Sequence, residues 1–158
     1  MLILGFDPGA SGALAVLSGD GKCIRVLPFD LSAYRDAIEQ ATWDKDGCVA
    51  CIEGVHAMPG QGVTSMFSFG RNKGLIEGML FQANVPYELV APAKWKRTFG
   101  LIFPKGTDKN TIKNASIAKA KELCEGISLK RTERCKTDSD GMAEAYLIAE
   151  HCRREIGY

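Results

Sequence analysis

Four acidic residues in this chain have the positions expected of a shared cation site. Asp7 follows the apolar run 2–6, and Glu53 closes a second apolar run at 48–52. If both runs are central, parallel strands, the two carboxylates emerge side by side at one edge of a sheet, where their repulsion is costly unless a cation bridges them. Either acid alone would also fit simple solvent exposure at the end of a strand.

The second pair of acids lies near the end of the chain. Asp140 and Glu144 are four residues apart in a segment with helical apolar spacing, so they share one face of the expected helix. Capping of the helix N-terminus would account for Asp138, Ser139 or Asp140. It does not account for Glu144, which interrupts an otherwise apolar helix and therefore favours a functional role.

Hard oxygen ligands of this kind suit Mg²⁺, which binds carboxylates together with water and substrate phosphate. Two such ions about 4 Å apart can activate a water and stabilise the leaving oxygen in phosphodiester hydrolysis. We therefore expect two Mg²⁺ ions in one site, replaceable by Mn²⁺. The expected ligands are Asp7, Glu53, Asp140 and Glu144.

The elements that must position these acids follow from the spacing of apolar residues. Strands are predicted at 2–6, 13–17, 22–27, 48–53 and 84–90, with an Asp-Gly hairpin turn between the second and third. Helices are predicted at 31–41, through 75–80 after a loop at 54–62, at 91–99, from a cap at 107–110 to 123, and at 139–154. This order predicts one α/β domain over residues 1–158, built on a mixed sheet.

The composition excludes several classes of protein. The 158 residues are 46% hydrophobic and 25% charged, proportions typical of a soluble globular domain that folds without disulfides. No apolar run reaches the roughly 18 residues that span a bilayer, and the first residues lack the layout of a signal peptide. We expect a cytoplasmic protein without a membrane partner.

The six cysteines favour free thiols over a disulfide framework or a zinc site. Cys48 and Cys51 have metal-ligand spacing, but they lie within an apolar strand. No second pair is suitably spaced to complete a zinc site.

The near-neutral net charge of +1 hides a strong asymmetry along the chain. Residues 1–90 carry a net charge of −4 and residues 91–158 carry +5, with a net charge of +8 in the segment 94–136. Such a local excess can neutralise several phosphates of a nucleic acid. A solvated basic face is the alternative interpretation.

Four blocks of the sequence together resemble RuvC-type Holliday junction resolvases, especially the short phage-type members. They are FDPGASGA (6–13), CIEGV (51–55), VAPAKWK (90–96) and AEAYLIA (143–149). The blocks keep the family order and span almost the whole chain. The resemblance implies an RNase H-like fold and a homodimer that makes paired, Mg²⁺-dependent nicks in four-way and other branched DNA junctions. It further implies a crossover junction endodeoxyribonuclease of a bacterial cell or a phage-infected host.

The resemblance also bears on the ligands. By position, Asp7 and Glu53 match the family's acids on the first and fourth strands. Glu144 stands where the family has Asp. Asp140 is then the expected fourth ligand, although family members often place an Asp or His at the position that is glycine 141 here. Asp138 is the reserve candidate.

Basic and loop residues complete the implied site. Lys96 and Lys109 resemble functional lysines of the family, which would contact the scissile phosphate or stabilise charge in the transition state. Positions expected to hold the DNA backbone are Lys94, Arg97, Lys105, Lys113 and Lys136. His56 and Met58 lie in the loop that, in this family, probes the junction centre.

The helical stretch around residue 75 carries a glycine at every fourth position. Gly70, Gly74 and Gly78 form a stripe that permits close approach of another helix. The resemblance implies that this region belongs to a dimer interface. Phe67 and Phe69 alternate with serines in the same stretch, and we expect them in the core, with a DNA-facing position as the alternative.

Two other functions remain open on the sequence. A ribonuclease or transposase-like nuclease with an RNase H-like fold would use the same four carboxylates. Residues 5–13 also resemble the first phosphate-binding loop of actin-like and sugar-kinase ATPases, but a chain of this length without a second glycine-rich loop is too short for their two-domain architecture. A DNA-binding module without catalysis would lack one of the acids, and all four are present.

Overall fold

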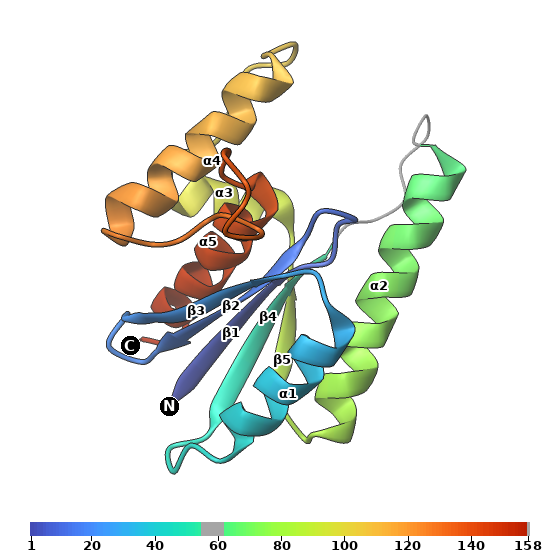
Figure 1. The fold of residues 1–158 in the computed structure, drawn as a ribbon, viewed down its shortest axis with the longest axis vertical. Coiled ribbons are helices and arrows are strands. Elements are labelled where there is room, and N and C mark those ends of the chain that lie inside the picture. The colour runs from blue at the N-terminus through green and yellow to red at the C-terminus, as the bar shows by residue number, and fades with distance from the viewer. Residues whose placement is uncertain (55–61, 158) are drawn as a thin grey trace.

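The computed structural model describes residues 1–54 and 62–157, which form a five-stranded sheet flanked by helices (Figure 1). The strands are β1 (Leu2–Asp7), β2 (Ala13–Ser18), β3 (Cys23–Pro28), β4 (Cys48–Glu53) and β5 (Tyr87–Val90). Their order across the sheet is β3-β2-β1-β4-β5. Strand β1 pairs antiparallel with β2 and parallel with β4, so the expected mixed sheet is confirmed.

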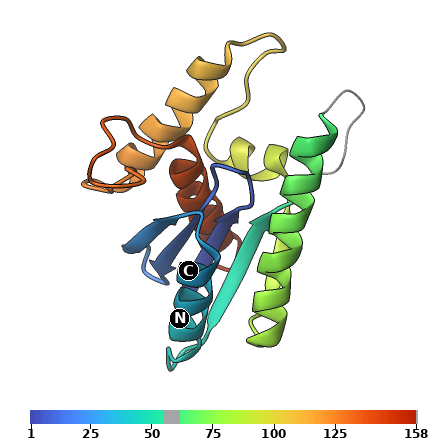
Figure 2. The ribbon, with the colours of Figure 1, turned by 45° about the vertical axis from the view of Figure 1, so that its right-hand side comes forward.

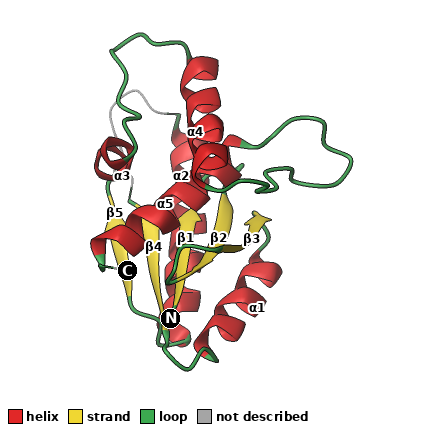
Figure 3. Cartoon of the chain, turned by 90° about the vertical axis from the view of Figure 1, so that its left-hand side faces the viewer, coloured by secondary structure: helices red, strands yellow, loops and turns green. Residues whose placement is uncertain are grey.

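The helices lie on both faces of this sheet. They are α1 (Leu31–Thr42), α2 (Val63–Gln82), α3 (Pro92–Thr98), α4 (Lys109–Leu123) and α5 (Asp140–Glu155). Helices α1 and α2 cover one face, whereas α5 crosses the other and is contacted by α3 and α4 (Figures 2 and 3). None of the helices in the described ranges is both long and apolar enough to cross a membrane.

Local signals explain where most helices begin. The carboxylate of Asp30 accepts hydrogen bonds from two backbone N–H groups of α1, and that of Asp108 accepts one from the N–H of Thr111 in α4. Pro92 occupies the first turn of α3, where its missing N–H costs nothing. Ser139 caps α5, which therefore begins at Asp140, one residue later than expected.

The strand expected at 84–90 is shorter than predicted. Asn84 has a positive φ of 54°, in the left-handed region that ends a helix. The N–H of Val85 still bonds to the carbonyl of Leu80 in α2. Strand β5 therefore begins only at Tyr87.

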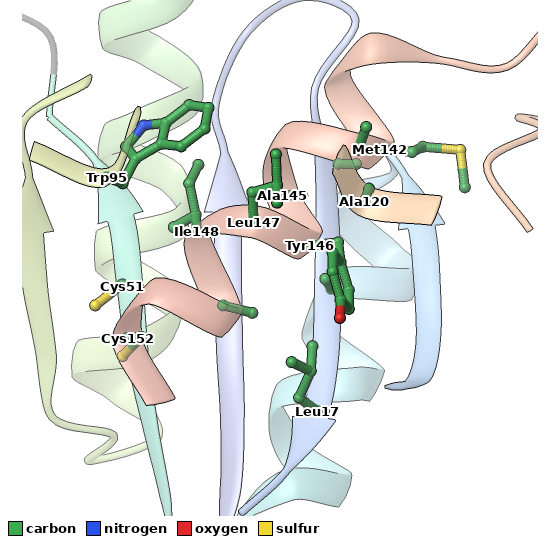
Figure 4. Close-up of a cluster of buried hydrophobic side chains, with 14 of the residues drawn as sticks. Leu17, Cys51, Trp95, Ala120, Met142, Ala145, Tyr146, Leu147, Ile148 and Cys152 are labelled. Carbon is green, nitrogen blue, oxygen red and sulfur yellow. The ribbon is translucent and has the colours of Figure 1, made fainter. Parts of the chain in front are cut away.

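Two apolar layers hold the helices to the sheet. Leu4 and Phe6 of β1 pack in the layer under α1 and α2, while Ile3 belongs to the layer under α5. This alternation is the period of two expected of a strand buried on both faces. Figure 4 shows part of the α5 layer, in which Trp95 of α3 and Ala120 of α4 join residues of α5 and the sheet.

Helix α5 lies unusually close to β1 because β1 has a glycine at its centre. A Cβ atom on Gly5 would come within 2.3 Å of the backbone nitrogen of Ala149 and 2.5 Å of the carbonyl oxygen of Ala145. Only glycine fits such an approach. The position of α5, and of the acids it carries, therefore depends on Gly5.

Helix α2 departs from the expectation for its aromatic residues. It buries a narrow stripe of Asn72, Ile76 and Leu80, spaced four residues apart. Phe67 lies off this stripe and its side chain is 74% exposed, so the expectation that it belongs to the core is wrong. Phe69 is half-buried. The reason is that only the stripe with Ile76 and Leu80 packs against the sheet, so the rest of α2 faces away from the core.

All six cysteines are free thiols in this structure, and Cys51 is buried in β4.

Candidate active site

Asp7 and Glu53 lie at the carboxyl ends of the two central, parallel strands. The register pairs Gly5 with Cys51 and Phe6 with Ile52, so Asp7 and Glu53 come next on β1 and β4. Both are buried, with exposed fractions of 7% and 8%. The structure therefore brings the two acids together at the sheet edge, as the strand pattern predicted.

The carboxyl group of Asp7 is electrostatically strained. Burial, followed by the neighbouring charge of Glu53 and then the charges of Glu144 and Asp140, raises its pKa to about 7. One stabilising contact opposes them, because the N–H of Gly9 donates to Asp7 Oδ1 at 2.9 Å. The four predicted acids thus influence one another electrostatically.

Glu53 is held by a residue for which the sequence predicted no role. Trp95 Nε1 donates to Glu53 Oε1 at 3.0 Å within the buried layer. Burial and then the charge of Glu144 raise the pKa of Glu53, and the Trp95 hydrogen bond and Lys96 partly offset this. The available signal was a tryptophan between the two lysines of VAPAKWK, since a large aromatic residue in a short basic helix is expected to anchor it to the core.

The first turn of α5 lies directly on the loop that follows Asp7. A Cβ atom on Gly141 would come within 2.1 Å of the carbonyl oxygen of Ser11 and 3.1 Å of Asp7 Oδ2. No side chain fits at position 141, so this chain has no room there for the Asp or His found in family members. Asp140 and Glu144 flank that contact and are both half-buried.

Two lysines contact the two candidate metal ligands of α5. Lys96 Nζ lies 3.5 Å from Glu144 Oε1, and Lys113 Nζ lies 2.8 Å from Asp140 Oδ2. The bond to Asp140 raises the pKa of Lys113 above its ordinary value. Ser116 Oγ also donates to Glu144 Oε1, at 3.2 Å. Asp140 and Glu144 are therefore each turned toward a partner on α3 or α4.

These contacts explain the open arrangement of the four acids. Within the described ranges, no three His, Cys, Asp or Glu side chains converge closely enough to hold a metal ion as they stand. The donor set nevertheless fits a hard cation, since it consists of carboxylate oxygens. No ion pair from a described residue reaches the buried acids Asp7 and Glu53. Asp140 and Glu144 are thus each paired with a lysine, whereas the two buried acids have no such partner among the described residues.

Asp138, the reserve candidate, has a different environment. Its carboxylate contacts the ammonium group of Lys121 on α4. Unlike Asp140, it is not among the main charges that raise the pKa of Asp7. The geometry therefore favours Asp140 as the fourth ligand.

Two further residues hold the loop after Asp7, and neither was predicted from the sequence. Asn72 Nδ2 on α2 donates to the carbonyl oxygen of Pro8 at 3.3 Å, and Arg131 Nη1 donates to that of Ser11 at 3.1 Å. Asn72 is buried, and a polar residue in the apolar stripe of a helix was the available signal. These bonds fix the backbone that presents the Gly9 N–H to Asp7.

The remaining basic residues are spread over a wider surface. Lys94 pairs with Glu155 at 2.8 Å, at the end of α5 opposite Asp140 and about 22 Å along the helix axis. The other predicted DNA contacts in the described ranges, Arg97, Lys105, Lys109 and Lys136, are exposed and form no ion pair with a described residue. Lys109 therefore does not contact the acids, in contrast to Lys113. His56 and Met58 lie outside the described residues.

Comparisons with known proteins agree with this fold. No family model and no curated protein sequence matches the chain. Solved structures do match. Among them, Thermus thermophilus RuvC in complex with a Holliday junction substrate has a TM-score of 0.65 and 14% identity, covering 99% of this chain and 97% of that one. A second T. thermophilus RuvC structure has a TM-score of 0.56 and 15% identity, covering 96% and 92%. The RNase H-like fold implied by the sequence resemblance is thus confirmed.

Proposed function

We propose that this protein is a structure-selective endonuclease that resolves four-way and other branched DNA junctions by Mg²⁺-dependent phosphodiester hydrolysis. The observation that carries the proposal is the burial of Asp7 and Glu53 at the carboxyl ends of β1 and β4, against the first turn of α5 that carries Asp140 and Glu144. These acids sit in a fold shared over nearly its full length with RuvC, one structure of which contains a Holliday junction.

The chemistry follows from the donor set. Two Mg²⁺ ions, or Mn²⁺ in their place, would be held by Asp7, Glu53, Asp140 and Glu144 and would supply water activation and stabilisation of the leaving oxygen. Trp95 fixes the orientation of Glu53. Lys96, 3.5 Å from Glu144, is close enough to the acids to neutralise charge on the scissile phosphate.

The DNA backbone would lie over the basic segment beside α5. Arg97 ends α3, and Lys105 and Lys109 flank the start of α4, two helices that both contact α5 (Figure 3). Lys113 lies one turn further along α4, and Lys94 and Lys136 extend the surface. We assign His56 and Met58, by the family resemblance, to the junction centre.

A homodimer would supply the second site needed for paired nicks. The outer face of α2 supports this, because Val63, Phe67 and Phe81 are 85%, 74% and 80% exposed. A Cβ atom on any of its three glycines would meet nothing within 4 Å, so this face is open to a close partner. Sedimentation at micromolar concentration should give a dimer, and a monomer would contradict this part of the proposal.

A ribonuclease or transposase-like nuclease is the second candidate, since it would use the same acids. The near-complete coverage of both chains in the match with junction-bound RuvC favours a resolvase. The actin-like alternative has no support in the described residues, which form one five-stranded sheet. We place the activity in the cytoplasm of a bacterial cell or a phage-infected host, where the free cysteines stay reduced.

The deciding experiment compares cleavage of a synthetic four-way junction, a linear duplex and an RNA–DNA hybrid, with Mg²⁺, Mn²⁺ or chelator. We expect paired nicks in the junction that disappear with chelator and in Asp7→Asn, while junction binding is retained. Asp36→Asn, an exposed acid on α1, is the matched control and should cleave normally. Preferred cleavage of the hybrid would refute the substrate, and cleavage in chelator would refute the mechanism.

A further inference from the structure

The ion pair between Lys113 and Asp140 places a cation of the protein on a candidate metal ligand. The ammonium nitrogen lies 2.8 Å from Asp140 Oδ2, and the two side chains are 52% and 27% exposed. Lys113 projects from α4, which packs against the first part of α5 (Figure 3). The contact therefore joins a basic residue of α4 to one of the four candidate metal ligands.

A lysine and a divalent ion cannot both use this carboxylate without cost. Two cations only a few ångströms apart repel each other strongly where water is partly excluded. The described acids do not yet converge on a common point, and Asp140 is turned toward Lys113. Recruitment of Asp140 to a metal would therefore release Lys113.

Lys113 is better suited to move than the other lysine of the site. Lys96 lies 5.0 Å from the centre of the Trp95 ring as well as near Glu144, and its side chain is only 24% exposed. Lys113 is half-exposed and has a flexible four-carbon stem. Once released, its ammonium can reach a phosphate lying over α4.

We propose that Lys113 is the counterion of Asp140 in the metal-free protein and that metal binding transfers it to a DNA phosphate. Lys113 is then a positioning residue that couples the two binding events. Metal binding to Asp140 frees Lys113 to contact DNA, and DNA binding to Lys113 removes the group that competes with the metal for Asp140. This inference rests on the proposed function, because it takes Asp140 as a metal ligand and DNA as the substrate.

The first test measures Mg²⁺ and Mn²⁺ affinity by calorimetry, without DNA. Lys113→Met should bind the metal about two- to fivefold more tightly than wild type, the range of a half-exposed ion pair. Lys113→Gln should behave in the same way, and Lys113→Arg should restore the wild-type affinity. Lys121→Met is the matched control, since Lys121 on the same helix pairs with Asp138, and its affinity should not change.

The second test measures the salt dependence of junction binding with chelator and with Ca²⁺, after checking that the strands stay intact. In wild type, Ca²⁺ should steepen the plot of log affinity against log salt concentration by about one phosphate contact. In Lys113→Met, both conditions should give the same slope. Lys113→Arg should recover the difference.

The outcomes separate the two levels of inference. If wild type binds no divalent metal, the proposed function itself is refuted. If wild type binds metal and Lys113→Met has the same affinity and the same change of slope, the role of Lys113 is refuted while the proposed function stands.

Discussion

Trp95 Nε1 and Glu53 Oε1 are joined by a buried hydrogen bond of 3.0 Å, which ties α3 to the carboxyl end of β4. Trp95→Phe should keep the packing of the ring but remove the donor. Because this bond lowers the pKa of Glu53 against the effect of burial, its loss should raise that pKa further. We expect cleavage at neutral pH to fall about tenfold and the rising limb of its pH profile to move to higher pH.

The control for this change is Trp43→Phe, at an exposed position beyond α1. It should leave the pH profile unaltered. A uniform loss of activity at every pH in Trp95→Phe would indicate a packing defect and contradict the assigned role.

The raised pKa of Asp7 predicts how the metal-free protein responds to pH. Burial and Glu53 raise this pKa from 3.8 to about 7, so the folded protein binds the proton more tightly than the unfolded chain. The resulting stabilisation is complete at low pH and is lost as the pH rises from about 4 through about 7, a difference of about 4 kcal/mol. Asp7→Asn removes the buried charge and should raise the melting temperature at pH 8 in chelator by about 5 °C or more.

With divalent metal, the wild type should instead melt at a higher temperature than Asp7→Asn. Wild type should gain stability with Mg²⁺ in proportion to its binding, whereas Asp7→Asn should gain little. Thermal unfolding with and without metal measures both effects, with Asp36→Asn as the exposed control. Equal melting temperatures of wild type and Asp7→Asn in chelator at pH 8 would argue against a strained carboxylate.

Short-range patterns were sufficient to predict the strands that carry Asp7 and Glu53. Each acid ends an apolar run, and the helical crossover between the runs favours parallel pairing. The spacing of Asp140 and Glu144 likewise predicted a shared helix face. The predicted ends of elements were less accurate than their existence. At Asn84, a left-handed backbone conformation ends α2, and β5 begins only at Tyr87 instead of at residue 84.

Contacts between distant elements could not be predicted from the sequence. Lys109 and Lys113 lie on the same helix one turn apart, and only the packing of α4 on α5 decides that Lys113 meets Asp140. The exposure of Phe67 depends in the same way on how much of α2 the sheet covers. The bonds of Asn72 and Arg131 to the loop after Asp7 join residues 64 and 120 positions apart.

The close contact of β1 with α5 predicts a large effect of a single methyl group. Gly5→Ala would place its Cβ 2.3 Å from the backbone nitrogen of Ala149 and should destabilise the protein by about 3 kcal/mol, since backbone must move. Asn114→Ala is the contrasting change. Its side chain is exposed on α4, and the better helix former should stabilise the protein by about 0.5 kcal/mol. Urea unfolding at one protein concentration measures both, and a neutral Gly5→Ala would contradict the observed packing.

Substitution of Asn72 should reduce function, although Asn72 is not one of the four candidate metal ligands. Its side chain is buried and donates to the carbonyl oxygen of Pro8, next to Asp7. Asn72→Leu keeps the volume but leaves that carbonyl without its donor, which should loosen the loop that presents Gly9 to Asp7. We expect Mg²⁺ affinity and cleavage to fall together, by about fivefold to tenfold, with junction binding in chelator unchanged. Gln82→Leu at the exposed end of α2 should alter neither, and an unchanged metal affinity in Asn72→Leu would exclude a positioning role for this residue.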